Sequence, residues 1–303
     1  MPNKEYEQRL MMISEFLDYM KYELHRSEKT VNSYAEDLEK FEAYFKNLSD
    51  QLSWETVDAD VVRDWMESMM DKGNTATSVN RRLSALHSFY RFALARKKVS
   101  KDPSHSIRGP KKSKPLPVFL KEKQMDDLLD RQTWGDDYME VCARTIIMTF
   151  YETGMRLSEL IALDDDSIDF INREIKVTGK GDKQRIIPFG NELEVTFREY
   201  MKLRDESLTR ESEALFLSDS GCRMTSASVR KIVKENLSRV CSLKKKSPHV
   251  LRHTFATAML NHDAGIESLK KLLGHASLST TEIYTHTTFE QLKRVYINAH
   301  PRA

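Results

Sequence analysis

A basic, proline-containing segment constrains the fold of this chain more than any other feature. Between Ser104 and Pro117 the prolines exclude a regular helix, and the lysines among them have no acidic neighbour. A chain of 303 residues also exceeds the usual length of one domain. The segment 104–117 is therefore predicted to be an extended linker between domains at 1–103 and 118–303.

The residues before the linker predict helices almost throughout. Apolar side chains recur at helical spacing in four successive stretches, of which the last three begin close to Ser27, Asp58 and Thr77. Short loops join these stretches, so they are expected to form a small four-helix bundle. The methionine and aromatic side chains on their apolar faces are expected to fill its core.

The residues after the linker mix two periodicities. Val141–Tyr151 predicts a buried helix that Gly154 ends, and 174–178 and 184–188 predict two strands with Gly179–Asp182 as the hairpin tip. Helical spacing returns over residues 228–243, 250–261 and 267–273. The fold class is therefore mainly α, with a helical N-terminal domain and a mixed α+β second domain that holds a small antiparallel sheet.

Composition indicates the kind of partner and the cellular compartment of the protein. The net charge is only +2, but Lys111 and Lys112 lie in the linker and Lys244–Lys246 directly precede a histidine motif. Each run alone fits a solvated surface, whereas together they favour a phosphate-backbone partner. The odd number of cysteines fits no disulfide framework, and neither a signal peptide nor a membrane span is indicated. We expect a cytoplasmic protein that needs no membrane.

Two arginines occupy positions suited to binding a phosphate. His249 and Arg252 are three residues apart at a predicted helix start behind Pro248, which places both side chains on one face. Arg156 follows the turn at Gly154, and Glu159 lies one helical step away, where it can hold the guanidinium group. Each motif alone fits an ordinary surface pair. Together the arginines can stabilise the charge that develops during phosphoryl transfer.

Two further residues have plausible chemical roles. Lys180 lies at the hairpin tip, where it can donate a proton to a leaving oxygen, and Lys183 competes for that role. Tyr284 is a candidate nucleophile, although forming its phenolate at neutral pH costs about 4 kcal/mol. No phosphate-binding glycine loop and no evident metal-binding carboxylate pair is found, and Asp164–Asp166 are interpreted as solvated helix-terminating residues.

The order and spacing of these residues resemble the catalytic set of the tyrosine recombinase (phage integrase) family. Leu273-Gly274-His275 follows the His249 motif, and Tyr284 comes nine residues after His275. The end of the chain, from Val295, is similar to the bacterial Xer branch and nearer to its XerC type than to its XerD type. The set comprises Arg156, Lys180, His249, Arg252, His275 and Tyr284.

The resemblance implies a role for each member of the set. Arg156 and Arg252 would clamp the scissile phosphate, and His275 would hydrogen-bond to it. Lys180 would be the general acid for the 5′ hydroxyl, His249 would assist proton transfer, and Tyr284 would form a 3′-phosphotyrosyl link. Glu159 would support the catalytic residues without itself contacting the phosphate. No metal or other cofactor is implied.

The resemblance also implies an assembly on double-stranded DNA. The N-terminal bundle would be a SAM-like core-binding domain, and a C-terminal tail at about 287–303 would exchange between protomers of a homo- or hetero-tetramer with a related recombinase. The implied function is site-specific recombination, with chromosome-dimer resolution alongside a septal DNA translocase as the leading role. An integrase or transposase of a mobile element, and a non-catalytic DNA-binding protein on the same fold, are the alternatives.

A wider group of basic residues is expected to contact the DNA. The group comprises Lys29, Arg81, Arg82, Lys111, Lys112, Lys183, Lys244, Lys245 and Lys246.

Overall fold

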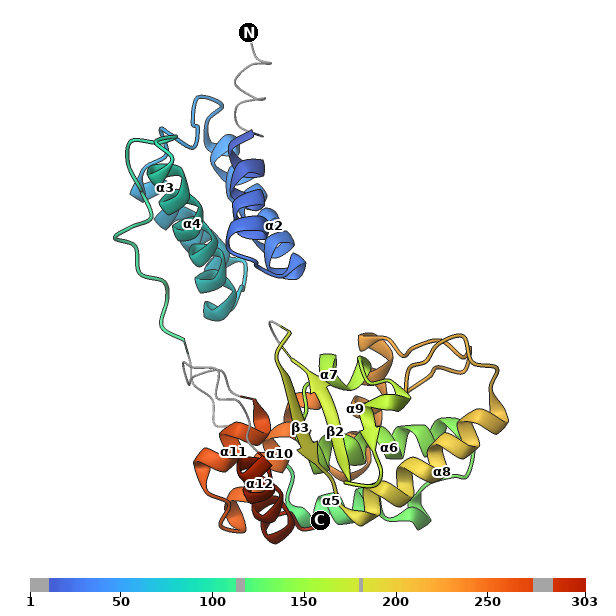
Figure 1. The fold of residues 1–303 in the computed structure, drawn as a ribbon. Helices are drawn as coiled ribbons and strands as arrows, with labels where there is room; N and C mark the ends of the chain where they lie inside the picture. The colour runs from blue at the N-terminus through green and yellow to red at the C-terminus, as the bar shows by residue number, and fades with distance from the viewer. Residues whose placement is uncertain (1–10, 113–117, 180–181, 275–285) are drawn as a thin grey trace. The chain divides into compact units, whose positions relative to one another are not determined.

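A computed structural model describes residues 11–112, 118–179, 182–274 and 286–303. The chain divides into two compact units, Met1–Pro115 and Leu116–Ala303 (Figure 1). The mainly helical class with one small antiparallel sheet is confirmed. Among the described helices, none combines the length and the apolar character needed to cross a membrane.

The first unit is helical. Residues 11–18 are helical and continue into a π-helical turn, and the elements that follow are η1 (Tyr19–Glu23), α2 (Glu28–Leu48), α3 (Ala59–Asp71) and α4 (Ala76–Ala95). The caps explain where the helices begin, because Ser27 accepts from the Thr30 amide and Asp58 from the Val61 amide. The helix expected after Thr77 begins slightly earlier, since Thr75 is its cap.

Aromatic rings fill the core of this unit. The ring centroids of Phe41 and Trp65 are 4.8 Å apart, and those of Trp54 and Phe89 are 4.5 Å apart. All four side chains are buried. The prediction that aromatic and methionine side chains form the core is confirmed, and their tilted and edge-on contacts add to the stability that burial provides.

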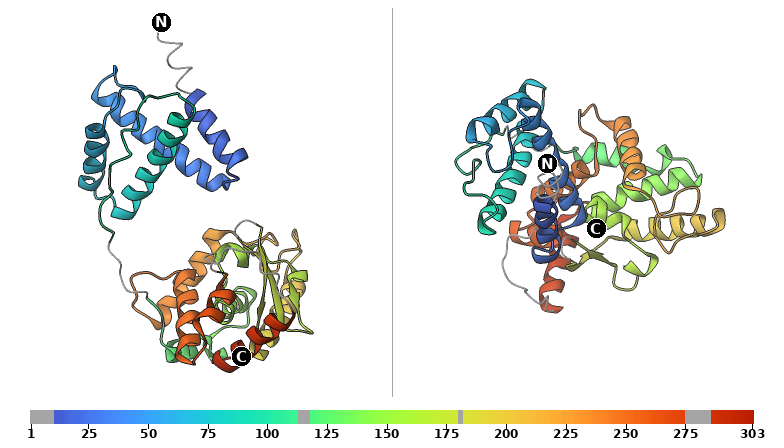
Figure 2. Two further views of the ribbon diagram at one scale, coloured as in Figure 1. Left: turned by 60° about the vertical axis from the view of Figure 1, so that its left-hand side comes forward. Right: turned by 90° about the horizontal axis from the view of Figure 1, so that it is seen from above.

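The second unit is built around the helix α6. Its elements in chain order are α5 (Glu122–Leu129), η2 (Arg131–Thr133), α6 (Tyr138–Thr153), α7 (Leu157–Ile161), η3 (Asp165–Ser167), β1 (Ile168–Asp169), β2 (Glu174–Thr178), β3 (Gln184–Pro188), α8 (Asn191–Ser207), α9 (Ser226–Val240), α10 (Pro248–Asn261), α11 (Ile266–Leu273) and α12 (His286–Ala299). Nearly every side chain of α6 from Cys142 onward is buried. Figure 2 shows α6 surrounded by the other helices and the sheet, and its contacts are with α8, α9 and α10.

The sheet is an antiparallel meander in the order β1-β2-β3. The two predicted strands pair in the expected hairpin, with Ile175 opposite Ile187 and Thr178 opposite Gln184. The short strand β1 was not predicted, because two residues are too few to show an alternating pattern. Inward-facing Ile175, Val177 and Ile187 join the core that contains α6.

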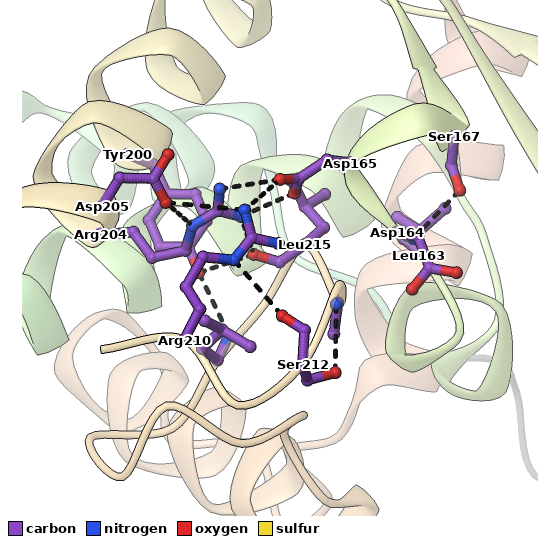
Figure 3. A network of polar contacts seen from close by, with 12 residues as sticks. Leu163, Asp164, Asp165, Ser167, Tyr200, Arg204, Asp205, Arg210, Ser212 and Leu215 are labelled. Atoms are coloured by element: carbon purple, nitrogen blue, oxygen red, sulfur yellow. Dashed lines mark hydrogen bonds and ion pairs between the residues drawn. The ribbon is translucent and has the colours of Figure 1, made fainter. Parts of the chain in front are cut away.

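A network of arginines and carboxylates ties α8 to the segment before β1 (Figure 3). The fully buried Arg204 donates to both carboxylate oxygens of Asp165, at 2.7 and 2.9 Å, and to the carbonyl oxygen of Leu215 at 2.9 Å. Arg223 donates to Asp164 at 2.5 Å. The interpretation of Asp164 and Asp165 as solvated residues is therefore incomplete, because their carboxylates stay about a third exposed (39% and 30%) but also pair with arginines from segments distant in the sequence.

The C-terminal helix α12 packs on its own unit. Leu292 and Tyr296 share an apolar cluster with Phe255 of α10 and Leu272 of α11. The Tyr296 hydroxyl donates to Oε2 of the buried Glu152 at 3.2 Å, and the Gly190 amide donates to the same oxygen at 3.1 Å. In the single chain the tail therefore covers α10 and α11 of the same molecule.

Candidate active site

Arg156 begins the short helix α7 just after a left-handed turn. Gly154 ends α6 with φ +57° and ψ 18°, as the sequence predicted. A Cβ atom there would collide with the ring of Phe255 and approach Leu273 within 2.9 Å, so both the backbone angle and the packing require glycine. The turn thus fixes the direction in which the chain leaves α6 toward Arg156.

Glu159 accepts two hydrogen bonds from Arg156. Its Oε2 accepts from the Arg156 amide at 2.6 Å, and its Oε1 accepts from Nη1 of the Arg156 side chain at 2.8 Å. The predicted contact between the two side chains is therefore confirmed. The Arg156 side chain remains one-third exposed (33%), which leaves part of the guanidinium group accessible to an anion.

Arg252 lies in the first turns of α10. Ser247 precedes this helix and Pro248 occupies its first turn, as predicted. The Arg252 side chain is buried, and its Nη1 donates to the carbonyl oxygen of Gly154 at 2.7 Å. Arg252 therefore contacts the same turn that positions Arg156. Burial, together with the positive charge of Arg156, lowers the pKa of Arg252 to about 10, which leaves it charged at neutral pH.

His249 lies one turn before Arg252 and keeps an exposed edge. Removal from bulk water and the charges of His253 and Arg252 lower its pKa below the ordinary value of 6.5. The imidazole is thus neutral at physiological pH. A neutral imidazole beside two cationic arginines is able to accept a proton.

Three arginines converge on the end of α11. Arg185 donates to the carbonyl oxygen of Leu272 at 3.0 Å, Arg252 to that of Leu273 at 2.7 Å, and Arg156 to that of Gly274 at 2.8 Å. The last carbonyls of a helix have no partner within the helix and carry its negative partial charge, so they are natural acceptors for guanidinium groups. The next residue in the chain is His275.

Sequence reasoning missed Arg185. Its Nη1 and Nη2 donate to the two oxygens of Glu159 at 2.7 and 2.9 Å, and its side chain is buried. Burial alone would raise the pKa of Glu159. The hydrogen bonds and positive charge of Arg185, and after them the hydrogen bonds of Arg156, have the larger effect and lower this pKa to about 2. Alternation along β3 could have revealed this residue, because Arg185 occupies an inward position like Ile187 and a buried arginine requires a carboxylate.

Comparison with known proteins defines the class of the chain. The model of the phage integrase family matches residues 118–291, and that of the phage integrase N-terminal SAM-like domain matches residues 13–97. The tyrosine recombinase XerC of Chlorobaculum parvum is 34% identical over 97% of this chain and 96% of its own length. The XerC of Staphylococcus saprophyticus is 36% identical, over 95% of this chain and 96% of its own length.

The chain belongs to the phage integrase family. It is a tyrosine recombinase, an enzyme that cuts and exchanges DNA strands at specific sites. A tyrosine recombinase named XerD, from Staphylococcus haemolyticus, is 34% identical over 96% of this chain and 99% of its own length. The fold is also that of the XerH recombinase bound to its difH substrate, with a TM-score of 0.71 at 23% identity over 95% of each chain.

Three members of the predicted catalytic set lie outside the described residues of the recombinase. They are Lys180, His275 and Tyr284. The structure nonetheless describes the residues beside two of them. Gly179, which precedes Lys180, donates its amide to the carbonyl oxygen of Lys183 at the base of the hairpin, and Gly274 precedes His275 at the helix end just described. Arg156 and the base of this hairpin meet at Glu159, and Arg252 binds the turn that precedes Arg156.

The basic residues predicted to contact DNA differ in how exposed their side chains are and in the partners that they have within the chain. Most of these side chains are exposed: Lys29, Lys111, Lys112, Lys183, Lys244 and Lys245, with Lys246 half-buried. Arg81 forms a bidentate pair with the buried Asp37, and Arg82 donates to Asn74 at 3.1 Å. These two arginines join α4 to α2 and α3, so each has a structural task whether or not it contacts DNA.

Proposed function

We propose that this recombinase cleaves DNA through Tyr284 with Arg156 and Arg252 holding the scissile phosphate. The convergence of Arg156 and Arg252 on the end of α11 supports this proposal most directly, since it places two guanidinium groups beside the residue before His275. His275 would donate to the phosphate, and Lys180 would protonate the leaving 5′ oxygen.

The chemistry would proceed by two transesterifications. The Tyr284 oxygen attacks phosphorus, the bond to the 5′ oxygen breaks, and a 3′-phosphotyrosyl link forms. His249, kept neutral by its surroundings, would take the phenolic proton. A 5′ hydroxyl of the partner strand then attacks the link and releases Tyr284. The arginines stabilise the extra negative charge of each pentacoordinate transition state.

The biological role we propose is resolution of chromosome dimers at cell division. Relatives named XerC and XerD match the chain over nearly their full lengths, which supports a housekeeping role more than integration of a mobile element. The active form would be a tetramer on two DNA sites, built from this chain alone or with a related recombinase. A septal DNA translocase would regulate it, and the tail at about 287–303 would exchange between neighbours.

A nicked suicide substrate tests the cleavage chemistry. The recombinase is incubated with DNA that carries a candidate chromosomal site, and the products are separated on a denaturing gel. We expect a covalent adduct that Tyr284→Phe abolishes. The exposed Tyr22 of the first unit supplies a matched control, and Tyr22→Phe should leave the adduct unchanged. An adduct that survives Tyr284→Phe, or none on any candidate site, would refute the proposal.

Genetics separates the two biological roles. Cells that lack the gene should accumulate unresolved chromosome dimers at division. A gene copy that carries Tyr284→Phe should fail to correct this defect. Normal division together with loss of a mobile element's excision would instead identify an integrase.

A further inference from the structure

Arg185 contacts both Glu159 and the end of α11. Its guanidinium group binds Glu159 through two nitrogens and the Leu272 carbonyl through the third. Glu159 in turn binds Arg156. The strand that carries Arg185, β3, pairs with β2, and these two strands flank Lys180 in the sequence. One buried side chain thus connects the hairpin, the Arg156 turn and the helix that leads to His275.

The packing around Arg185 leaves little room for movement. A Cβ atom on Gly274, whose φ is +64°, would lie 3.2 Å from three atoms of the Arg185 side chain. A Cβ atom on Gly179 would lie 3.3 Å from Oε1 of Glu159 and 3.8 Å from Nη1 of Arg185. Two glycines, one before Lys180 and one before His275, therefore let the backbone come close to the same ion pair.

The charges explain why a second arginine is needed behind the first. Glu159 is buried, and burial raises the free energy of its ionised form unless cationic partners offset the loss of water. Arg185 contributes most to lowering the pKa of Glu159, so it keeps the negative charge that Arg156 needs. Without Arg185, Arg156 would lose part of its support, and the Leu272 carbonyl at the end of α11 would lose its donor.

We propose that Arg185 is a positioning residue for DNA cleavage, which holds Glu159, and through it Arg156, in register with the last turn of α11. The inference rests on the proposed function, because it assumes that Arg156 and His275 act on the phosphate. Arg185 itself does not touch the DNA in this proposal. It acts on the rate of cleavage rather than on the affinity for DNA.

Arg204 offers a matched control in the same unit. Like Arg185, it is buried, pairs with both oxygens of one carboxylate and donates to one backbone carbonyl, here that of Leu215 (Figure 3). It differs in making a further ion pair with Asp205 and in belonging to the network around Asp165. Loss of either arginine should weaken the fold, but only loss of Arg185 should disturb the site.

The test compares Arg185→Met and Arg185→Lys with Arg204→Met and Arg204→Lys in the full chain. The single-turnover rate of adduct formation and the affinity for the same DNA are measured for each, with Tm as the measure of folding. We expect the Arg185 variants to lose about 10²-fold in cleavage rate, as for a site displaced by about 1 Å, while DNA affinity changes less than about threefold. Arg185→Lys supplies the result if Arg185→Met does not fold.

The pH profile and a double variant make the test specific. Loss of Arg185 raises the pKa of Glu159 and so adds a second titrating group to His249, which makes the cleavage rate of Arg185→Met fall more steeply with decreasing pH than that of the unaltered chain. A folding defect lowers the rate equally at every pH. Combined with Glu159→Gln, the Arg185 variant should lose less than the product of the two single losses.

The possible outcomes separate the inference from the function. A normal cleavage rate in Arg185→Met, or equal losses in the Arg185 and Arg204 variants at equal Tm, would overturn the inference alone. Failure of the unaltered chain to form any adduct would overturn the proposed function, and this inference with it.

Discussion

Replacing Glu152 by glutamine should make the second unit more stable in alkaline solution. Glu152 lies at the end of α6 and is fully buried, and its Oε2 accepts from the Gly190 amide and the Tyr296 hydroxyl. Within the described part of the chain its Oε1 has no hydrogen-bond partner. Burial raises the pKa of Glu152 to about 8, although the Gly190 hydrogen bond opposes the change. The folded chain therefore favours the neutral acid.

The magnitude follows from the difference between the folded and unfolded chain. In the unfolded chain Glu152 ionises near its ordinary pKa of 4.5, whereas in the folded chain it ionises near 8. The stability that the neutral group provides is complete below pH 4.5 and is lost as the pH rises to about 8. At about 1.36 kcal/mol per pKa unit, the loss is on the order of 4 kcal/mol above that pH.

Chemical denaturation of the full chain, followed by circular dichroism, measures the effect. Glu152→Gln should recover on the order of 4 kcal/mol at about pH 8.5 and less than about 1 kcal/mol at about pH 5. The exposed Glu235 on α9 supplies the control, because surface substitutions change stability by less than about 0.5 kcal/mol. An equal effect of Glu152→Gln at both pH values would show that Glu152 does not titrate as described.

Two other predictions concern the site itself. Gly154→Ala should destabilise the second unit by about 2 to 4 kcal/mol, from the left-handed backbone and the collision with Phe255. Gly73→Ala is the control, because Gly73 has φ +76° but a Cβ atom there would meet nothing within 4 Å, so only the backbone strain should reduce the stability. Equal losses of unfolding free energy in the two variants, measured by urea denaturation, would disprove the steric argument. Because the pKa of His249 lies below 6.5, less than half of the imidazole is protonated at pH 6.5, so single-turnover cleavage should keep more than half of its rate at that pH. A rate already halved above pH 6.5 would contradict this.

The local features of the fold could be predicted from the sequence. Ser27 and Asp58 cap their helices, the two long strands pair as expected, and Gly154 ends α6 in the left-handed conformation. The contact between Arg156 and Glu159 was also predictable, because the residues are one helical turn apart. In each case a few neighbouring residues determine the structure.

Long-range polar pairs could not be predicted in the same way. Arg185 meets Leu272 at a separation of 87 residues, and Arg204 meets Asp165 at 39. No periodicity connects such positions, and a charged residue in a strand or helix gives no sign of its distant partner. The sequence therefore predicted the contact between Arg156 and Glu159 but missed Arg185, which binds the same carboxylate.

The three arginines at the end of α11 also link the docking of that helix to the order of the candidate site. Arg156, Arg185 and Arg252 come from three separate elements, and each rests on a different carbonyl of the same helix end. A chain in which α11 has not docked lacks these three acceptors, so Arg156 and Arg185 would still share Glu159, and Arg252 would still bind the Gly154 carbonyl, without the end of α11 to align them. Under the proposed function, the recombinase would therefore complete its phosphate-binding site only once α11 has docked.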